Sequence, residues 1–245
     1  MRKTLVNAFI FGFIAIGFSQ KLYKAVENNE TEKVEKLIAK GVEINEYHKN
    51  GLFPLWRATA DNNYSIAKLL IAAGADVNQP SKVSPANSPP ISIACQDGYF
   101  DIIKLLVENG ANVNYLGYKK FTPIRIAARN GHIEIVKYLA ERGAEIDVKA
   151  EDGATPLEHA SYMGHIEIVK YLIEKGANIN HIDKEGDFPI GEASKQGRLE
   201  VVQYLIEQGA DLTLKNDQNK TALDLAKERG QNKVATLIED HLAKK

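Results

Sequence analysis

Apolar side chains recur along this chain at the spacing of one face of an α-helix. Ile135, Val136 and Leu139 show the pattern between His132 and Gly143, with charged residues in the positions between them. Glycine readily takes the positive φ that ends a helix, so this segment is predicted to be a helix that stops at Gly143. We expect Leu139 to lie inside the fold.

A shorter helix is predicted immediately before each segment of this kind. Thr155 can cap a helix that opens with Pro156, because the missing N–H of proline costs nothing at the first helical position. Gly164 ends this helix and His165 begins the next one. Small residues on the shorter helix, such as Ala160, let neighbouring helices approach closely. The sequence therefore predicts helix–turn–helix units.

The helix pairs repeat with a period close to 33 residues. The glycines that end the longer helices are Gly41, Gly74, Gly110, Gly143, Gly176 and Gly209. Such a period indicates stacked units in which each unit contacts its neighbours. The spacing grows to 36 between Gly74 and Gly110, where the proline-rich segment 79–90 lies. This segment is predicted to be a longer loop, either a specificity element or a tolerated spacer.

The repeated unit resembles the ankyrin repeat, whose pattern contains Thr-Pro-Leu-His, then Gly-His, then Gly-Ala-Asp. Thr155-Pro156-Leu157, Gly164-His165 and Gly176-Ala177 match that pattern in one unit. The resemblance covers about residues 20–242 and implies an all-α ankyrin-repeat solenoid of about seven helix–turn–helix units with projecting β-hairpin fingers. One repeat domain is expected over residues 20–245, with units at approximately 20–48, 49–81, 82–117, 118–150, 151–183, 184–216 and 217–245.

The chain also departs from the ankyrin pattern. The position that holds histidine in the family's turn holds Trp56, Ser92, Arg125, Glu158, Gly191 and Asp224. Phe53 and Phe188 replace the capping threonine in two units. Some hydrogen bonds of the family's turn must therefore be absent or made differently.

Residues 1–19 differ from the rest of the chain. Two basic residues precede the apolar run Leu5–Phe18, and Ser19 suits cleavage before Gln20. As a helix this 14-residue run would span roughly 21 Å, less than the ~30 Å hydrocarbon core of a bilayer. We therefore expect a cleaved signal peptide, export to the periplasm or the medium, and no stable membrane insertion after cleavage.

Candidate catalytic chemistry is sparse. The six histidines form no cluster with metal-ligand spacing, and His132 and His165 occupy the structural Gly-His position, so no metal site is predicted. Cys95 is the single cysteine and is expected to be a buried, inert thiol, which excludes an intramolecular disulfide. The glycines follow the repeat period and form no phosphate loop. We predict no catalytic residue and no cofactor, and an enzyme is disfavoured.

The charge pattern favours a protein partner over a nucleic acid. A net charge of −1 gives none of the basic excess expected of a nucleic-acid-binding protein. The fourth unit is basic and the fifth is acidic, which suits a protein with complementary charges. The basic residues are Lys119, Lys120, Arg125 and Arg129, and the acidic ones are Glu151, Asp152 and Glu158.

The resemblance also implies where a partner binds. In ankyrin-like stacks the finger tips and the exposed side of the inner helices form the concave binding face. Aromatic residues, methionine and arginine are frequent in interfaces, and several of them lie at these positions here. The predicted partner-binding residues are Trp56, Tyr118, Lys119, Phe121, Arg129, Tyr162 and Met163.

These features together predict an exported, monomeric module that binds a protein through its concave face and finger loops. Three roles stay open: partner or protector of a periplasmic enzyme, immunity protein against a toxin, and secreted effector acting on a host protein. A toxin gene beside its own gene would favour the immunity role.

Overall fold

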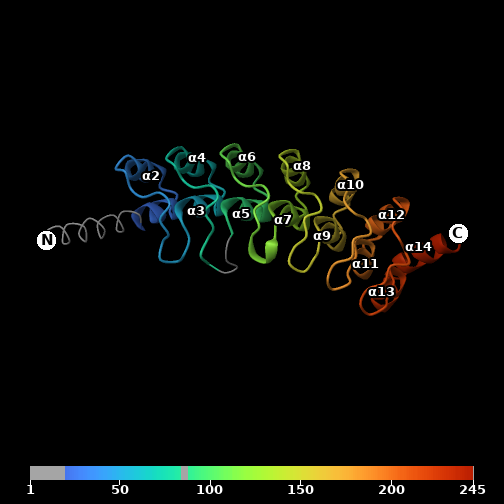
Figure 1. Cartoon of the computed structure of the whole chain (residues 1–245). Helices are drawn as coiled ribbons and strands as arrows, with labels where there is room; N and C mark the ends of the chain where they lie inside the picture. Colours follow the sequence, from blue (N-terminus) through green and yellow to red (C-terminus); the bar gives the residue numbers. More distant parts are fainter. Residues whose placement is uncertain (1–19, 84–87, 245) are drawn as a thin grey trace. The chain divides into compact units, whose positions relative to one another are not determined.

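The computed structural model describes residues 20–83 and 88–244, so the predicted signal peptide lies outside the described residues. Within these ranges all the regular elements are helices (Figure 1). They fall into two compact units, one ending at Asn112 and the other beginning at Val113. No helix in the described ranges is long and apolar enough to cross a membrane.

The first unit begins with a helix over residues 20–27. Its further helices are α2 (Thr31–Ile38), α3 (Pro54–Ala60), α4 (Tyr64–Ala72), α5 (Pro90–Asp97) and α6 (Phe100–Glu108). The shorter helices α3 and α5 pack side by side, and α2, α4 and α6 pack in a second row.

The second unit continues the same alternation. Its elements are η1 (Tyr118–Lys120), α7 (Pro123–Asn130), α8 (Ile133–Glu141), α9 (Pro156–Met163), α10 (Ile166–Glu174), α11 (Pro189–Lys195), α12 (Leu199–Glu207), α13 (Ala222–Glu228) and α14 (Asn232–Leu242). Helices α7, α9, α11 and α13 form an inner row, and α8, α10, α12 and α14 form an outer row (Figure 1). The predicted helix pairs are confirmed.

Proline and glycine set the helix ends as the sequence predicts. Pro156 opens α9, and the Thr155 hydroxyl accepts a hydrogen bond from the Glu158 N–H at 3.3 Å. Gly164 ends the helix with a φ of 87°. Phe188 occupies the threonine position before α11, where it is buried and offers no acceptor. The expected difference between the turns is therefore confirmed.

The core lies between the two rows of helices. Leu139 and Leu172 of the outer row are fully buried, as their spacing predicts. Cys95 of α5 is also fully buried, and burial raises the pKa of its thiol. The cysteine therefore packs as a small apolar residue, as expected.

His165 joins one helix pair to the preceding one. Its Nε2 lies 3.1 Å from the backbone carbonyl of Arg129, at the end of α7. A Cβ atom on Gly131 would lie 2.7 Å from the His165 ring, so the glycine also leaves room for this contact. The structural role predicted for His165 is confirmed.

A ladder of asparagine side chains ties successive repeats together. Asn114 accepts a hydrogen bond from the Glu145 N–H at 2.9 Å and donates one to the Gly143 carbonyl at 2.9 Å. Asp147 follows in this series and accepts from the Asn178 N–H at 2.8 Å. As a carboxylate it has no N–H group to donate. In the first unit, the two-bond pattern recurs at Asn45 and Asn78.

The fingers are closed by hairpin-type backbone bonds, although no strand forms among the described residues. The Asp183 N–H donates to the Asp187 carbonyl at 2.9 Å, and the Lys184 N–H donates to the Asp152 carbonyl of the preceding finger at 2.9 Å. A Cβ atom on Gly153, which has a φ of 92°, would lie 3.0 Å from the Lys184 nitrogen. Neighbouring fingers therefore hold one another, and their side chains, in place.

Candidate functional site

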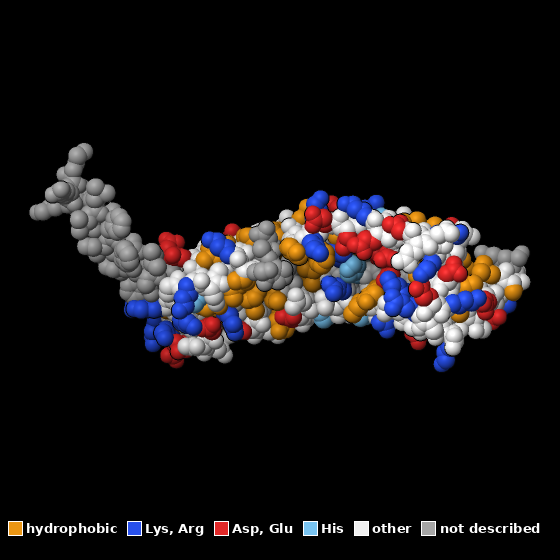
Figure 2. Space-filling view, turned by 90° about the horizontal axis from the view of Figure 1, so that it is seen from below, with side chains coloured by type: hydrophobic (Ala, Val, Ile, Leu, Met, Phe, Trp, Pro, Cys, Tyr) orange, Lys and Arg blue, Asp and Glu red, His pale blue; other side chains and the backbone are white. Residues whose placement is uncertain are grey.

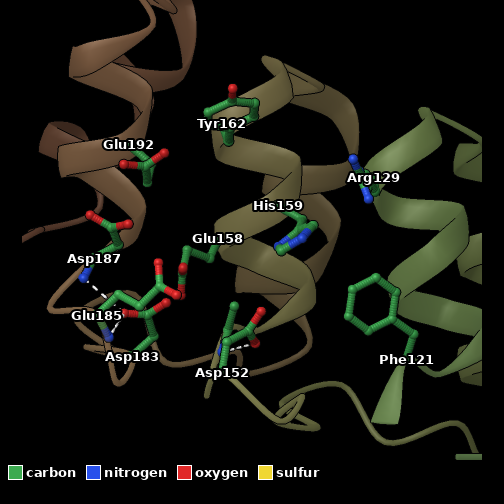
Figure 3. Close-up of a pocket in the computed structure, with 11 residues that line it drawn as sticks. Phe121, Arg129, Asp152, Glu158, His159, Tyr162, Asp183, Glu185, Asp187 and Glu192 are labelled. Atoms are coloured by element: carbon green, nitrogen blue, oxygen red, sulfur yellow. Dashed lines mark hydrogen bonds between the residues drawn. The ribbon is translucent and has the colours of Figure 1, made fainter. Parts of the chain in front are cut away.

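A pocket of about 340 Å³ lies in the second unit, between the inner helices α7, α9 and α11 (Figure 3). Helix α9 contributes Glu158, His159 and Tyr162, and Phe121 and Arg129 line the side formed by α7. The fingers before α9 and α11, and α11 itself, add Asp152, Ala154, Asp183, Glu185, Asp187 and Glu192. We call this site the α9 pocket.

The α9 pocket has two chemically different ends. In Figure 3 the carboxyl groups of Glu158 and Asp183 lie on one side of His159, and Arg129 and Phe121 lie on the other. Near the middle of Figure 2, acidic side chains gather beside a histidine, with basic and apolar side chains next to it. The pocket therefore has an acidic end, and an opposite end that is aromatic and basic.

Arg125 is buried behind the aromatic end. Its side chain is only 1% exposed, and its Nη2 lies 3.0 Å from the His159 Nε2 and 3.5 Å from an Asp152 carboxylate oxygen. Its guanidinium carbon lies 3.8 Å from the centre of the Phe121 ring. The prediction that Arg125 belongs to an exposed basic face is wrong, because the finger carboxylate, the imidazole and the aromatic ring together enclose it.

His159 is uncharged at neutral pH. Burial, and then the positive charge of Arg125, lower the pKa of His159 to about 4. Because a guanidinium can only donate, the His159 Nε2 accepts from Arg125 and the ring proton sits on Nδ1. His159 is therefore a neutral acceptor for Arg125, set between the two ends of the pocket.

Glu158 lies at the acidic end and is also buried, with 4% of its surface exposed. No N–H or O–H group of the described residues reaches its Oε2. Burial, and then the charges of Asp183 and Asp187, raise the pKa of Glu158 to about 9. The prediction that Glu158 is part of an exposed acidic face is wrong. It is a buried carboxyl that faces other carboxyls, and it holds a proton at neutral pH.

The neighbours of Glu158 are fixed by the finger and by α11. The Asp183 Oδ1 accepts from the backbone N–H groups of Glu185 and Asp187, both at 2.8 Å. Burial, and then the charge of Glu192, raise the pKa of Asp187 to about 6. Glu192 itself pairs with Lys195 at 2.9 Å. Among the described residues no group of His, Cys, Asp and Glu side chains is arranged to hold a metal ion.

Comparison with known proteins agrees with the repeated helix pairs. Residues 22–116 and 91–183 match the family description "Ankyrin repeats (3 copies)", and residues 172–226 match "Ankyrin repeats (many copies)". The chain belongs to the ankyrin-repeat family. Ankyrin repeats are generally protein–protein interaction modules.

A relative supports the same assignment. An ankyrin repeat protein of Fowlpox virus (strain NVSL) is 42% identical to this chain over 62 residues. The match covers 25% of this chain and 15% of the viral protein, so this chain spans only a small part of that relative's length.

Within the ankyrin repeats, three of the predicted partner-binding residues come together. Phe121, Arg129 and Tyr162 all line the α9 pocket, and Tyr162 is 41% exposed. Tyr118 and Lys119 lie on η1 in the finger before α7, and Tyr118 is 52% exposed. These five residues therefore belong to neighbouring fingers and inner helices of the second unit.

Met163 and Trp56, like Tyr118 and Lys119, do not line the pocket. Met163 is the last residue of α9 and is exposed next to Tyr162 in the sequence. Trp56 belongs to α3 of the first unit, where it is half-buried and its Nε1 has no hydrogen-bond partner among the described residues.

The acidic end of the pocket was predicted from the sequence only in part. Asp152 and Glu158 are among the acidic residues that the sequence predicts to suit a partner, whereas Asp183 and Glu192 are not, although all four line the pocket. One signal was available, because Glu158 occupies the same repeat position as Arg125, 33 residues earlier. Oppositely charged residues at one position of successive ankyrin repeats indicate that the inner helices carry a basic and an acidic end side by side.

Proposed function

We propose that this ankyrin-repeat protein binds a protein partner through the α9 pocket and the adjoining finger tips. The supporting observation is the convergence of Phe121, Arg129 and Tyr162 on one concave pocket whose fingers are bonded to one another. Exposed aromatic residues and arginine are frequent binding hot spots, and fixed fingers reduce the ordering cost of binding.

On the outer face of α8 and α10, exposed side chains of opposite charge pair with one another. On α8 and α10, Lys137 pairs with Glu134 at 3.6 Å and Lys170 pairs with Glu167 at 2.9 Å, all on exposed positions. Exposed ion pairs of this kind contribute little to the free energy of folding and are typical of a solvated surface. The inner and finger side is therefore the side proposed to recognise the partner.

The proposal is tested with substitutions on the two sides. A partner is first recovered by affinity capture and mass spectrometry, and its affinity is then measured by calorimetry. Tyr118→Ala and Tyr162→Ala should each weaken binding by more than ~1 kcal/mol, since both remove exposed aromatic anchors. Lys137→Ala and Lys170→Ala are the matched outer-face controls and should leave the affinity unchanged. The reverse pattern would place the interface on the outer face.

We also propose that the chain acts by recognition alone, as a monomer, without nucleic acid or cofactor. The buried Cys95 thiol and the neutral His159, already engaged by Arg125, offer no activated nucleophile or free base. The net charge of −1 supplies no basic surface for phosphates. Light scattering in solution tests the monomer, and any concentration-dependent dimer would contradict it.

Export remains a proposal that rests on residues 1–19. If these residues act as a signal peptide, the mature protein begins near Gln20 and is found in the periplasm or the medium. N-terminal sequencing of protein from each fraction tests this, and an intact Met1 on cytoplasmic protein would contradict it. The protector, immunity and effector roles are then distinguished by the partner that the captured protein brings with it.

A further inference from the structure

The acidic end of the α9 pocket has more carboxyl groups than basic partners. Glu192 pairs with Lys195, and Asp152 pairs with the buried Arg125. For Glu158, Asp183 and Asp187 the described part of the chain supplies no basic side chain within ion-pair distance. Carboxyl groups collected in a concave site without matching cations attract a cation from outside the chain.

Glu158 gives an independent indication that an incoming group completes this site. Its side chain lines the pocket and is 4% exposed, and its Oε2 receives no N–H or O–H group among the described residues. Buried polar atoms in folded proteins are nearly always paired, because an unpaired one costs about 1–3 kcal/mol. A hydrogen-bond donor that enters the pocket would remove this cost.

The walls of the pocket favour a flat cation over a compact one. Tyr162, which is 41% exposed, lines the pocket. His159, whose ring is neutral, also lines it. A guanidinium is planar, stacks on aromatic faces and presents five N–H donors in a fork that fits carboxylates. An ammonium is more strongly hydrated and has only three donors.

We propose that the α9 pocket receives an arginine side chain of the partner protein, with Glu158, Asp183 and Asp187 as hydrogen-bond acceptors and Tyr162 as the aromatic wall. This inference rests on the proposed function and names the chemistry that the partner presents. Arg129 at the opposite end repels the guanidinium, so the incoming charge is directed to the acidic end.

Binding should release a proton. The proton that Glu158 holds in the free protein leaves to solvent as the guanidinium enters, so the affinity should rise with pH. The charged and titratable groups around Glu158 come from every element packed against it. They are Arg125 and Arg129 on α7, His159 on α9, Asp152, Asp183 and Asp187 on the fingers, and Glu192 and Lys195 on α11.

The test uses the whole protein and short peptides, with binding followed by NMR. The probe is acetyl-Gly-Arg-Gly-amide, and the matched neutral probe carries citrulline in place of arginine, which keeps the shape and removes the charge. The arginine peptide should shift the resonances of Tyr162 and His159 and bind at least ~10-fold more tightly than the citrulline peptide. A lysine peptide should bind less tightly than the arginine peptide.

Two variants distinguish binding in the pocket from non-specific attraction of the peptide to acidic residues on the surface. Glu158→Gln should weaken binding of the arginine peptide by about 5–10-fold and remove the rise in affinity above pH ~7, where Asp187, with a pKa of about 6, is already ionised. Glu151→Gln makes the same substitution on the exposed finger, outside the pocket, and should leave the affinity unchanged. Equal binding of the arginine and citrulline peptides, tighter binding of lysine, or an unaltered Glu158→Gln variant would each overturn the arginine proposal.

The protein-binding function is judged separately. If Tyr118→Ala and Tyr162→Ala weaken the captured partner while Glu158→Gln does not, the partner interface stands and the arginine pocket is wrong. If Glu158→Gln weakens the captured partner as well as the peptide, both proposals are supported.

Discussion

Arg125 and Glu158 occupy the same position in successive repeats, and both are buried, but the protein treats their charges differently. Arg125 finds a carboxylate, an imidazole nitrogen and an aromatic ring within its own unit. Glu158 faces the acidic Asp183 and Asp187, its carboxyl group also contacts the Thr155 backbone, and no donor reaches its Oε2 among the described residues. Both side chains keep buried atoms without a hydrogen-bond partner among the described residues, Nε and Nη1 of Arg125 and Oε2 of Glu158, but Arg125 alone has a partner of opposite charge within ion-pair distance.

This difference separates a structural charge from one available for recognition. Removing one member of a buried, paired set of charges is costly, because the remaining partners stay buried without compensation. A buried carboxyl that is kept neutral by a proton lowers the stability of the fold, but it leaves a hydrogen-bond acceptor inside the pocket. Substitutions of Arg125, Glu158 and His159 test this contrast, and a substitution in the finger before α7 follows with a smaller expected effect.

Arg125→Ala should produce the largest change. It empties a fully buried site, removes the cation beside Asp152 and leaves the His159 Nε2 without its donor. The free energy of unfolding should fall by roughly 2–4 kcal/mol. Urea unfolding followed by circular dichroism measures this.

Arg129→Ala is the matched control for Arg125→Ala, because Arg129 lies one turn later on α7 but is exposed. It should change the unfolding free energy by less than ~0.5 kcal/mol. Equal effects of the two substitutions would show that the burial of Arg125 has no energetic consequence.

Glu158→Gln should stabilise the protein at alkaline pH. The folded-state pKa of about 9 lies above the ordinary value of 4.5, so the folded state binds the proton more tightly. The stability that the folded state gains from binding this proton is fully present below pH 4.5 and is lost as the pH rises through 9. Glutamine has no proton to lose, so the variant should be more stable at pH 8, by about 1–3 kcal/mol.

Unfolding curves at several pH values between 5 and about 9 check this prediction. Above pH ~7, where Asp187 with its pKa of about 6 is already ionised, the wild-type protein should lose stability and the variant should not. Glu185→Gln, which removes an exposed carboxylate from the same pocket, should leave the slope unchanged. A wild-type protein whose stability rises over this range would contradict the buried, protonated Glu158.

His159→Gln tests the imidazole that accepts a hydrogen bond from Arg125. The folded-state pKa of about 4 lies below the ordinary value of 6.5, so the folded state holds the neutral ring. Its contribution to stability is present above pH 6.5 and is lost as the pH falls through 4. Glutamine keeps an acceptor for Arg125 and cannot become charged. The difference in unfolding free energy between the variant and the wild type should therefore be ~1–2 kcal/mol more favourable to the variant at pH 4 than at pH 7. An NMR titration in which His159 becomes protonated near pH 6.5 would contradict this.

Lys120→Gly should have the smallest effect among the substitutions that are expected to change stability. Lys120 has a φ of 58°, and the same repeat position holds Gly153 and Gly186 in the next two fingers. Glycine relieves the cost of this left-handed conformation but loses more chain entropy on folding, so the net gain should be about 0.5 kcal/mol. The melting temperature measures it, and Gly153→Ala should shift the melting temperature in the opposite direction. A loss of stability in Lys120→Gly would mean that the finger conformation carries no strain.

The fold could be predicted from the sequence because the informative residues act through their own backbone. Pro156 and Gly164 set the ends of α9 wherever the helix packs, and the spacing around Leu172 shows which face is inside. The side-chain network of the α9 pocket could be predicted only in part. Whether Arg125 or Glu158 points to water depends on the side chains that it meets in the next repeat, and local spacing does not encode those encounters.

Asp147 leaves one link of the asparagine ladder incomplete. It accepts from the Asn178 N–H but has no N–H group to donate, and its Oδ1 is buried without a hydrogen-bond partner among the described residues. The same two repeats are also joined by the contact of His165 with the Arg129 carbonyl and by that of Arg125 with His159. Neighbouring repeats therefore share redundant contacts, and this redundancy lets the stack tolerate a change at one position of the ladder.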